Sequence, residues 1–203
     1  MNGVLPSAIV LAGGESQRLG RPKALVEFSG KTLIAWAVDH LRAAGCNPVV
    51  VVAHPRLVTS LETILEGVVV VENPHPERGR TGSLQIGFQT LMSLQKTLSS
   101  VVMAPIDRPG WNIPLVHRLV EHGGSACPRS NGIRGHPVVF DSESIAQVMQ
   151  ADTSAPLRNV VSFQSVELDA PWLHLNIDTS EDVESLQSHQ SELLAYFLEG
   201  EGI

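Results

Sequence analysis

LAGGESQRLGRPKAL, residues 11–25, follows the apolar run Ala8-Ile9-Val10 and combines glycines with arginine and lysine in a fixed order. Gly13 and Gly14 lie where a buried strand would end. Because glycine has no Cβ, the backbone there can turn sharply and bring its N–H groups against an anion. Arg18 and Lys23 add positive charge. The stretch therefore predicts a phosphate-binding loop between a strand and a helix.

The spacing of this loop excludes two common phosphate-binding motifs. After Gly13 and Gly14 the next glycine is Gly20, which is too late for the dinucleotide motif GxGxxG. The chain's GK[ST] tripeptide begins at Gly30, but Leu25 stands five positions earlier, where a P-loop requires glycine. An ordinary strand-to-helix turn is the simplest alternative, although turns do not require arginine and Pro-Lys at set offsets.

The pattern LAGG-x-S-x-R-x-G-x-PK resembles the signature of the MobA-like nucleotidyltransferases, which include the molybdenum-cofactor guanylyl- and cytidylyltransferases. The resemblance implies an α/β fold: a Rossmann-like three-layer α/β/α nucleotidyltransferase fold with a mostly parallel central sheet. It also implies that Arg18 and Lys23 are catalytic. The nucleotide-binding residues that it implies in this loop are Leu11, Ala12, Gly13, Gly14, Ser16, Arg18 and Lys23.

Length and charge limit the class of protein. A chain of 203 residues is most simply one domain, spanning 1–203. Its net charge of −7 and its lack of long Lys/Arg clusters argue against a nucleic-acid partner. In such an acidic chain, Arg18, Arg21 and Lys23 within six residues indicate local attraction of a polyphosphate.

Cysteine usage and hydropathy indicate the compartment. Cys46 and Cys127 match neither a CxxC site nor a disulfide framework, which is typical of a reducing compartment. No apolar run approaches the ~18 residues that span a bilayer, and the N-terminus lacks a signal-peptide pattern. We therefore expect a cytoplasmic protein with no membrane partner.

Apolar runs predict most of the sheet. The runs at 8–12, 49–53, 68–71 and 100–106 read as buried strands, and the absence of polar alternation favours a parallel sheet covered on both faces. Helical spacing predicts helices over 31–44, 57–65 and 112–122, and another beginning near Ser83. Two late strands are expected at 166–168 and 172–175, and Asn131-Gly132 predicts a hairpin.

The polar segment 72–82, ENPHPERGRTG, forms a second candidate loop. In the resembled family, an Asn after the third strand and a Ser-Leu opening a helix border the nucleotide. Asn73 and Ser83 occupy these positions, which implies a role in selecting the base and ribose. A plain surface loop with Ser83 as the helix N-cap is the alternative.

Two acidic residues are candidate metal ligands. Asp107 follows the strand 100–106, and a carboxylate at the carboxyl edge of a parallel sheet can hold Mg²⁺. It matches the family's Asp-x-Pro, although Arg108 replaces a usually neutral or apolar residue. Asp178, in a segment resembling the family's D-I-D-T-P-E-D-L, is implied as the second Mg²⁺ ligand. A turn residue before proline is the alternative for Asp107, and for Asp182 we prefer helix capping.

A third segment resembles the acceptor-binding region of the family. Residues 134–138 match the RGHPV element of the cytidylyltransferase-like branch, which implies acceptor contacts by Arg134 and His136. Arg158 stands where relatives often have Gly-Ala-Arg and is a third acceptor candidate. A structural histidine is the alternative for His136.

Together these segments predict transfer of a nucleotidyl group from an NTP to a phosphorylated acceptor, with release of pyrophosphate and Mg²⁺ as cofactor. The N-terminal half would bind the NTP and the C-terminal half the acceptor. Molybdopterin is the first choice of acceptor, and a molybdoenzyme could receive the product. The base, guanine or cytosine, stays open. A sugar 1-phosphate or another small phosphorylated metabolite is an alternative acceptor, and a non-catalytic nucleotide-binding accessory protein is a second alternative.

Overall fold

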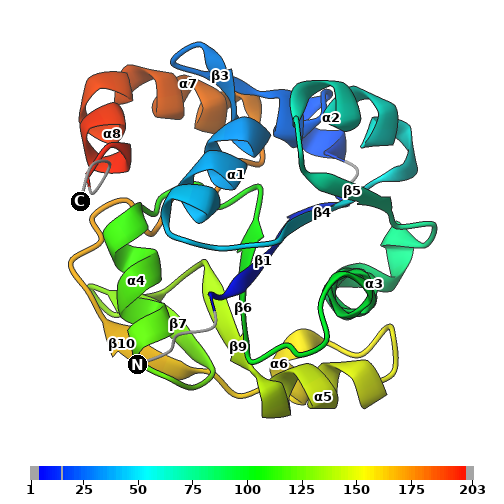
Figure 1. The fold of residues 1–203 in the computed structure, drawn as a ribbon. Coiled ribbons are helices and arrows are strands. Elements are labelled where there is room, and N and C mark those ends of the chain that lie inside the picture. The colour runs from blue at the N-terminus through cyan, green and yellow to red at the C-terminus, as the bar shows by residue number, and fades with distance from the viewer. Residues whose placement is uncertain (1–4, 15, 200–203) are drawn as a thin grey trace.

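The computed structural model describes residues 5–14 and 16–199, which form a mixed sheet with the order β10-β7-β9-β6-β1-β4-β5, and β8 paired to β7 (Figure 1). β1 is parallel to β4 and β6, and β4 to β5, whereas β9 is antiparallel to β6 and β7. The mostly parallel α/β fold is confirmed. The strands are β1 (Ser7–Ala12), β4 (Val49–Ala53), β5 (Val69–Glu72), β6 (Ser100–Pro105), β7 (Ala126–Ser130), β8 (Ile133–Arg134), β9 (Val138–Asp141) and β10 (Gln164–Glu167), with β2 (Glu27–Phe28) and β3 (Lys31–Thr32) pairing separately.

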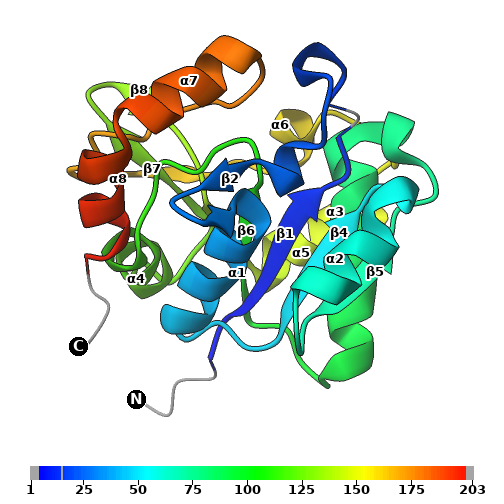
Figure 2. The same cartoon turned by 90° about the horizontal axis from the view of Figure 1, so that it is seen from above.

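Helices cover both faces of the sheet, which gives three layers (Figure 2). Side chains of β1 alternate between the faces: Val10 belongs to the apolar cluster under α1, and Ile9 to the cluster under α3. On the first face lie α1 (Leu33–Ala43), α2 (Val58–Ile64), α4 (Ile113–Glu121), α7 (Ser180–Ser188) and α8 (Gln190–Phe197). On the second lie α3 (Gly79–Leu94), α5 (Ser142–Gln150) and α6 (Leu157–Val160).

The strand expected at 172–175 is wrong, because this segment forms consecutive turns. The Leu173 N–H donates to the Ala170 carbonyl at 3.1 Å, and the Leu175 N–H donates to the Trp172 carbonyl at 3.0 Å. The Trp172 carbonyl also lies against Gly110, where a Cβ would come within 1.8 Å of its oxygen. The segment is therefore held by turns and by close backbone packing, without a partner strand.

Two further expectations need adjustment. The helix expected near Ser83 begins at Gly79, and the Ser83 hydroxyl donates to the Gly79 carbonyl at 2.9 Å, so Ser83 is not an N-cap. The strand expected at 68–71 exists as β5 but lies at the sheet edge, where Val69 is 39% exposed. The predicted hairpin is confirmed, because Asn131 and Gly132, at φ 49° and 80°, connect β7 to β8.

The sheet brings three loops to one edge. The segments after β1, β4 and β6 leave the carboxyl ends of adjacent parallel strands, and β1 lies between the other two. In open α/β sheets such an edge is where ligands bind. Across residues 5–14 and 16–199, no helix is long and apolar enough to cross a bilayer.

Candidate active site

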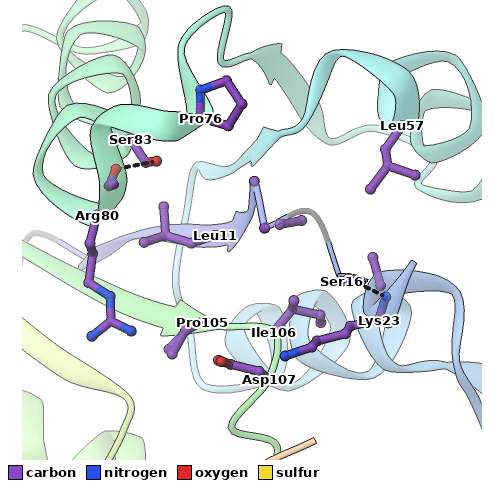
Figure 3. Close-up of a pocket in the computed structure, with 15 residues that line it drawn as sticks. Leu11, Ser16, Lys23, Leu57, Pro76, Arg80, Ser83, Pro105, Ile106 and Asp107 are labelled. Atoms are coloured by element: carbon purple, nitrogen blue, oxygen red, sulfur yellow. Dashed lines mark hydrogen bonds between the residues drawn. The ribbon is translucent and has the colours of Figure 1, made fainter. Parts of the chain in front are cut away.

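A cavity of about 290 Å³ opens at this edge of the sheet (Figure 3). Its lining comes from the loop after β1, the start of α3 and the end of β6, with Leu57 contributed from the segment after β4. Among the predicted nucleotide-binding residues, those that line it are Leu11, Ala12, Gly13, Gly14, Ser16, Lys23 and Ser83. The cavity therefore joins the first and second predicted loops.

The loop after β1 folds back on itself so that Lys23 lines the cavity. The N–H groups of Leu19 and Gly20 both donate to the Ser16 carbonyl at 3.2 Å, and the Ser16 hydroxyl accepts from the Lys23 N–H at 3.1 Å. Ser16 and Gly20 adopt positive φ values of 53° and 70°. Glycine suits the second of these positions, because a Cβ disfavours this backbone region. Ser16 thus contributes both backbone and side chain to closing the loop.

Asp178 is the centre of an ion-pair cluster with the two predicted catalytic cations. One carboxylate oxygen accepts from the Lys23 ammonium, and the other lies 3.0 Å from Arg18 Nη2. Asn176 Nδ2 donates to that second oxygen at 2.7 Å. The hydrogen bond from Lys23, supported by Asn176 and the charges of both cations, lowers the pKa of Asp178 to about 2. The carboxylate is therefore ionised at neutral pH and positions both cations.

Backbone hydrogen bonds fix the position of Asp178. The Ile177 N–H donates to the Asp107 carbonyl at 2.9 Å, which joins the segment before α7 to the segment after β6. Asp182 accepts from the N–H groups of Asp178 and Thr179, each at 2.8 Å, and completes a capping box with Thr179. The capping interpretation of Asp182 is confirmed. The hydrogen bond between the main chains of Ile177 and Asp107 therefore places Asp107 and Asp178 at the same edge of the site.

The second loop is organised around the buried side chain of Asn73, which is 1% exposed. Asn73 Nδ2 donates to the Ser83 hydroxyl at 3.0 Å, and Asn73 Oδ1 accepts from the His75 N–H at 2.9 Å. A Cβ on Gly13 would lie 3.8 Å from Ser83 Oγ and 3.9 Å from Asn73 Nδ2. The buried Asn73 therefore stabilises the second loop through these two hydrogen bonds, whereas Ser83 lines the cavity.

Asp107 lines the cavity and is a suitable ligand for Mg²⁺. Within the described part of the chain, no hydrogen bond or ion pair engages its carboxylate, and no three His, Cys, Asp or Glu side chains gather as a metal cluster. Mg²⁺ is commonly held by one or two carboxylates together with substrate phosphates, so a single unengaged carboxylate fits this ion. Both oxygens of Asp178 are already engaged by Lys23, Arg18 and Asn176.

None of the three predicted acceptor residues, Arg134, His136 and Arg158, is among the residues that line the cavity. The guanidinium of Arg134 donates to the Phe163 carbonyl, and Arg158 is exposed on α6; neither residue lines the cavity. His136 Nε2 lies 3.4 Å from Nη1 of Arg80, which does line it. Arg80 was not predicted as a site residue, because the only indication in the sequence is a positively charged side chain directly after Gly79.

Burial, together with the charges of Arg80 and Arg108, lowers the pKa of His136 to about 3. The imidazole is therefore neutral at neutral pH. Because arginine only donates hydrogen bonds, its contact with Arg80 makes Nε2 the acceptor and leaves the ring proton on Nδ1. Nδ1 is buried and has no hydrogen-bond partner among the described residues.

The names of proteins similar in sequence to this chain describe several different activities. A nicotine blue oxidoreductase from Paenarthrobacter nicotinovorans is 30% identical over 202 residues, covering 89% of this chain and 93% of that protein. A 2-C-methyl-D-erythritol 4-phosphate cytidylyltransferase from Rhodococcus jostii is 34% identical, covering 75% and 65%. A molybdenum cofactor guanylyltransferase from Xanthomonas euvesicatoria is 24% identical, covering 73% and 66%.

Solved structures share the fold at low sequence identity. Rv0371c from Mycobacterium tuberculosis superposes with a TM-score of 0.76 at 22% identity, covering 93% of this chain and all of that one. The same protein in complex with manganese gives a TM-score of 0.68 at 19% identity, covering 91% and 99%. The profile of the family described as "MobA-like NTP transferase domain" matches residues 8–169, which is most of the chain. With the glycine loop, the cavity and this match in agreement, the protein belongs to the MobA-like NTP transferases.

Proposed function

We propose that this protein transfers a nucleoside monophosphate from CTP or GTP to a phosphorylated small molecule and releases pyrophosphate. The observation that carries the proposal is the cluster in which Asp178 holds Lys23 and Arg18 beside a cavity lined by Asp107. Transfer of a nucleotidyl group from a triphosphate requires cations at fixed positions, and this cluster supplies two.

In this proposal the NTP lies along the loop after β1. The backbone N–H groups of Gly13 and Gly14 face its phosphates, and Leu11 and Ala12 form the wall of the cavity behind them. Ser83 contacts the base or ribose, held in place by its hydrogen bond from Asn73. The opening of the cavity at Gly14 leaves room for the phosphates, because a Cβ there would meet no atom within 4 Å.

The chemical step needs no covalent enzyme intermediate. An oxygen of the acceptor phosphate attacks the α-phosphorus, the bond from the α-phosphorus to the bridging oxygen breaks, and pyrophosphate leaves with that electron pair. Lys23 and Arg18 move from Asp178 to the phosphates and neutralise the charge that develops on the leaving group. Lys23 and Arg18 form their ion pairs with Asp178 again when the product leaves, and these ion pairs keep both cations close to the cavity.

A divalent cation fits the same site. Asp107 would hold Mg²⁺ directly, and Asp178 would become its second ligand after releasing Lys23 and Arg18. When bound, such an ion would supply charge neutralisation for the phosphate groups. The manganese complex of Rv0371c, which has the same fold, supports a divalent ion of this kind.

Molybdopterin, or its molybdenum-loaded form, is the acceptor that we propose first, with a molybdoenzyme receiving the product. The molybdenum cofactor guanylyltransferase among the relatives supports this choice, and the erythritol-phosphate cytidylyltransferase supports another small phosphorylated acceptor. We place the reaction in the cytoplasm, the reducing compartment in which the free thiols of Cys46 and Cys127 persist.

A second candidate function is redox chemistry on a nucleotide cofactor bound by the same loop. The relative named nicotine blue oxidoreductase favours it, because that protein matches along 89% of this chain. The two candidates differ in their products: nucleotidyl transfer releases pyrophosphate, whereas redox chemistry consumes a reduced or oxidised cofactor.

The test is pyrophosphate release by the purified protein with each NTP, Mg²⁺ or Mn²⁺, and a panel of acceptors. The panel contains molybdopterin, 2-C-methyl-D-erythritol 4-phosphate and sugar 1-phosphates. We expect release with one NTP and one acceptor, and a fall of roughly a hundredfold in Arg18→Ala, the scale for losing one preorganised charge contact. Oxidation of NADH or NADPH by a phenolic or quinone-like dye, with no pyrophosphate from any pair, would overturn the transferase proposal in favour of the second candidate.

A further inference from the structure

His40 on α1 lies at the centre of a buried aromatic cluster and is 3% exposed. The ring centroids of Trp36, Trp111 and Phe197 lie 5.4, 5.7 and 5.5 Å from that of His40. Phe28 of β2 completes the cluster, with its ring centroid 5.5 Å from that of Phe197. The cluster therefore joins α1 to β2, to the segment after β6 and to the end of α8.

Both ring nitrogens of His40 face a backbone carbonyl. Nδ1 lies 2.8 Å from the Trp36 carbonyl oxygen, one turn earlier on α1, and Nε2 lies 2.8 Å from the carbonyl oxygen of Phe197, the last residue of α8. A carbonyl oxygen accepts hydrogen bonds and does not donate them. A neutral imidazole carries one N–H, so one of the two contacts would then place two lone pairs against each other. Both contacts are hydrogen bonds when the ring is an imidazolium.

The surroundings of the ring suit a cation. The Phe197 carbonyl belongs to the C-terminal end of α8, where the helix dipole is negative. The faces of aromatic rings attract cations, and three aromatic side chains pack around His40. Lys31, whose Nζ is 4.6 Å from the centroid of the Trp36 ring, is paired with Asp39. The carbonyls, the dipole and the rings therefore offset the cost of burying one positive charge.

The other ionisable side chains of the packed elements do not line the small cavity beside His40. That lining comes from α1, β6, the segment after β6 and α8, and its other members in the described ranges are not ionisable. Asp107 and Arg108 are half-buried and lie outside this lining. Burial raises the pKa of Tyr196 on α8, so its hydroxyl is neutral. The remaining ionisable side chains on α1, α4 and α8 or directly after α8 are exposed: Asp39, Arg42, His117, Arg118, Glu121, Glu192 and Glu199.

We propose that His40 is a buried imidazolium whose two N–H groups attach the end of α8 to α1, and that loss of one proton at rising pH weakens this attachment. Deprotonation leaves one N–H on the ring, so one hydrogen bond is replaced by repulsion between a nitrogen lone pair and a carbonyl oxygen. The proposal does not depend on the proposed nucleotidyl transfer.

The attachment lies where three segments that carry site residues pack together. Phe28 shortly follows the loop 11–25, and Trp111 belongs to the segment after β6. Phe197 belongs to the C-terminal segment that carries Asp178. The charge state of His40 therefore bears on the packing of all three segments.

NMR on the wild-type protein measures the protonation of His40 directly. The ring nitrogen resonances are assigned through the backbone of His40 and recorded over a range of pH. Free histidine is mostly neutral at about pH 7.5. At that pH we expect both ring nitrogens of His40 to have the chemical shifts of protonated nitrogens, with two slowly exchanging N–H protons. One protonated and one unprotonated nitrogen at about pH 7 in the folded protein would overturn the proposal.

The pH dependence of urea unfolding is an independent test. Above about pH 6.5 the folded protein would hold a proton that the unfolded chain has released. The stabilisation is therefore complete below about pH 6.5, and above it the unfolding equilibrium constant should rise by up to about tenfold per pH unit until His40 deprotonates. His40→Gln should remove this dependence and raise the constant by about 10- to 100-fold at about pH 6. The matched control His117→Gln, at an exposed position of α4, should keep the dependence.

Hydrogen exchange on the wild-type protein locates the weakened contact, and it decides the matter even where His40→Gln does not fold. The Leu198 N–H donates to the Leu194 carbonyl at the end of α8, and the Gln95 N–H donates to the Leu91 carbonyl at the end of α3, both at 3.0 Å. Once His40 deprotonates, the protection factor of Leu198 should fall by about tenfold or more, with that of Gln95 unchanged. Equal changes at the two amides, or the same pH dependence of unfolding in wild type and His40→Gln, would rule out the attachment.

Discussion

Replacing Asp178 with asparagine removes the charge at the centre of the ion-pair cluster and keeps the shape of the side chain. In the folded protein the pKa of Asp178 is lowered from 3.8 to about 2. At about 1.4 kcal/mol per pKa unit, a shift of roughly two units gives an upper limit of about 2.5 kcal/mol. Arg18 is 71% exposed, so water and salt screen its share. We expect Asp178→Asn to lose about 1.5 kcal/mol of unfolding free energy at neutral pH.

The pH dependence of that loss has a definite sign. Because the folded pKa lies below the unfolded value, the ionised carboxylate stabilises the protein above about pH 4, and the contribution is lost as the pH falls through about 2. The difference in unfolding free energy between wild type and Asp178→Asn should therefore be complete near neutrality. It should shrink steadily between about pH 4 and pH 2.

Urea unfolding of both proteins at several pH values and two salt concentrations measures this difference. Asp39→Asn is the matched control, because its carboxylate pairs with Lys31 at 2.7 Å on the surface, where it is 48% exposed. The control should lose at most about 0.5 kcal/mol. Equal stability of wild type and Asp178→Asn at neutral pH, or a loss that is the same at about pH 3 as at about pH 7, would refute the reasoning.

Three other predictions concern the cavity and its frame. Lys23→Ala should lower kcat by roughly a hundredfold, whereas Lys31→Ala should leave it within about twofold; steady-state kinetics on the identified substrates decides. Asp107→Asn should raise the Mg²⁺ concentration needed for half-maximal turnover by about tenfold or more, measured by Mg²⁺ titration; an unchanged requirement argues against this ligand. Gly110→Ala should cost about 3 kcal/mol, because the Trp172 carbonyl would have to move. Gly124→Ala, with no atom closer than 3.8 Å, is its control in thermal unfolding and should cost under about 1 kcal/mol.

Strand prediction from the sequence succeeded where burial alone determines the structure. Residues 49–53 are apolar without interruption, and β4 occupies that range because helices cover both of its faces. Residues 172–175 are also apolar apart from His174, yet turns after Pro171 and the packing of Trp172 on Gly110 override the pattern. The apolar pattern of a sequence does not indicate that the Trp172 carbonyl occupies the space where a Cβ on Gly110 would lie.

The sequence indicates how residues within one motif lie together, but it does not indicate groupings of residues from distant segments. Ser16 and Lys23 are joined inside one loop, so their spacing in the sequence carries the information. Arg80 and His136 are 56 positions apart, and nothing in either segment indicates the other. Arg134 lies close to His136 in sequence, but Gly135 packs against Leu173 between them, and the Arg134 side chain bonds to the Phe163 carbonyl instead.

The hydrogen bond from Ile177 to the Asp107 carbonyl has a consequence for dividing this chain into fragments. The family profile ends at residue 169, so a fragment cut there would keep the glycine loop and Asp107 but lose Asp178. It would also lose α8, whose Phe197 carbonyl lies 2.8 Å from Nε2 of the buried His40 on α1. Transferring the loop and cavity to another protein therefore requires about the last thirty residues as well, because Asp178 in that segment forms the ion pairs with Lys23 and Arg18 of the loop.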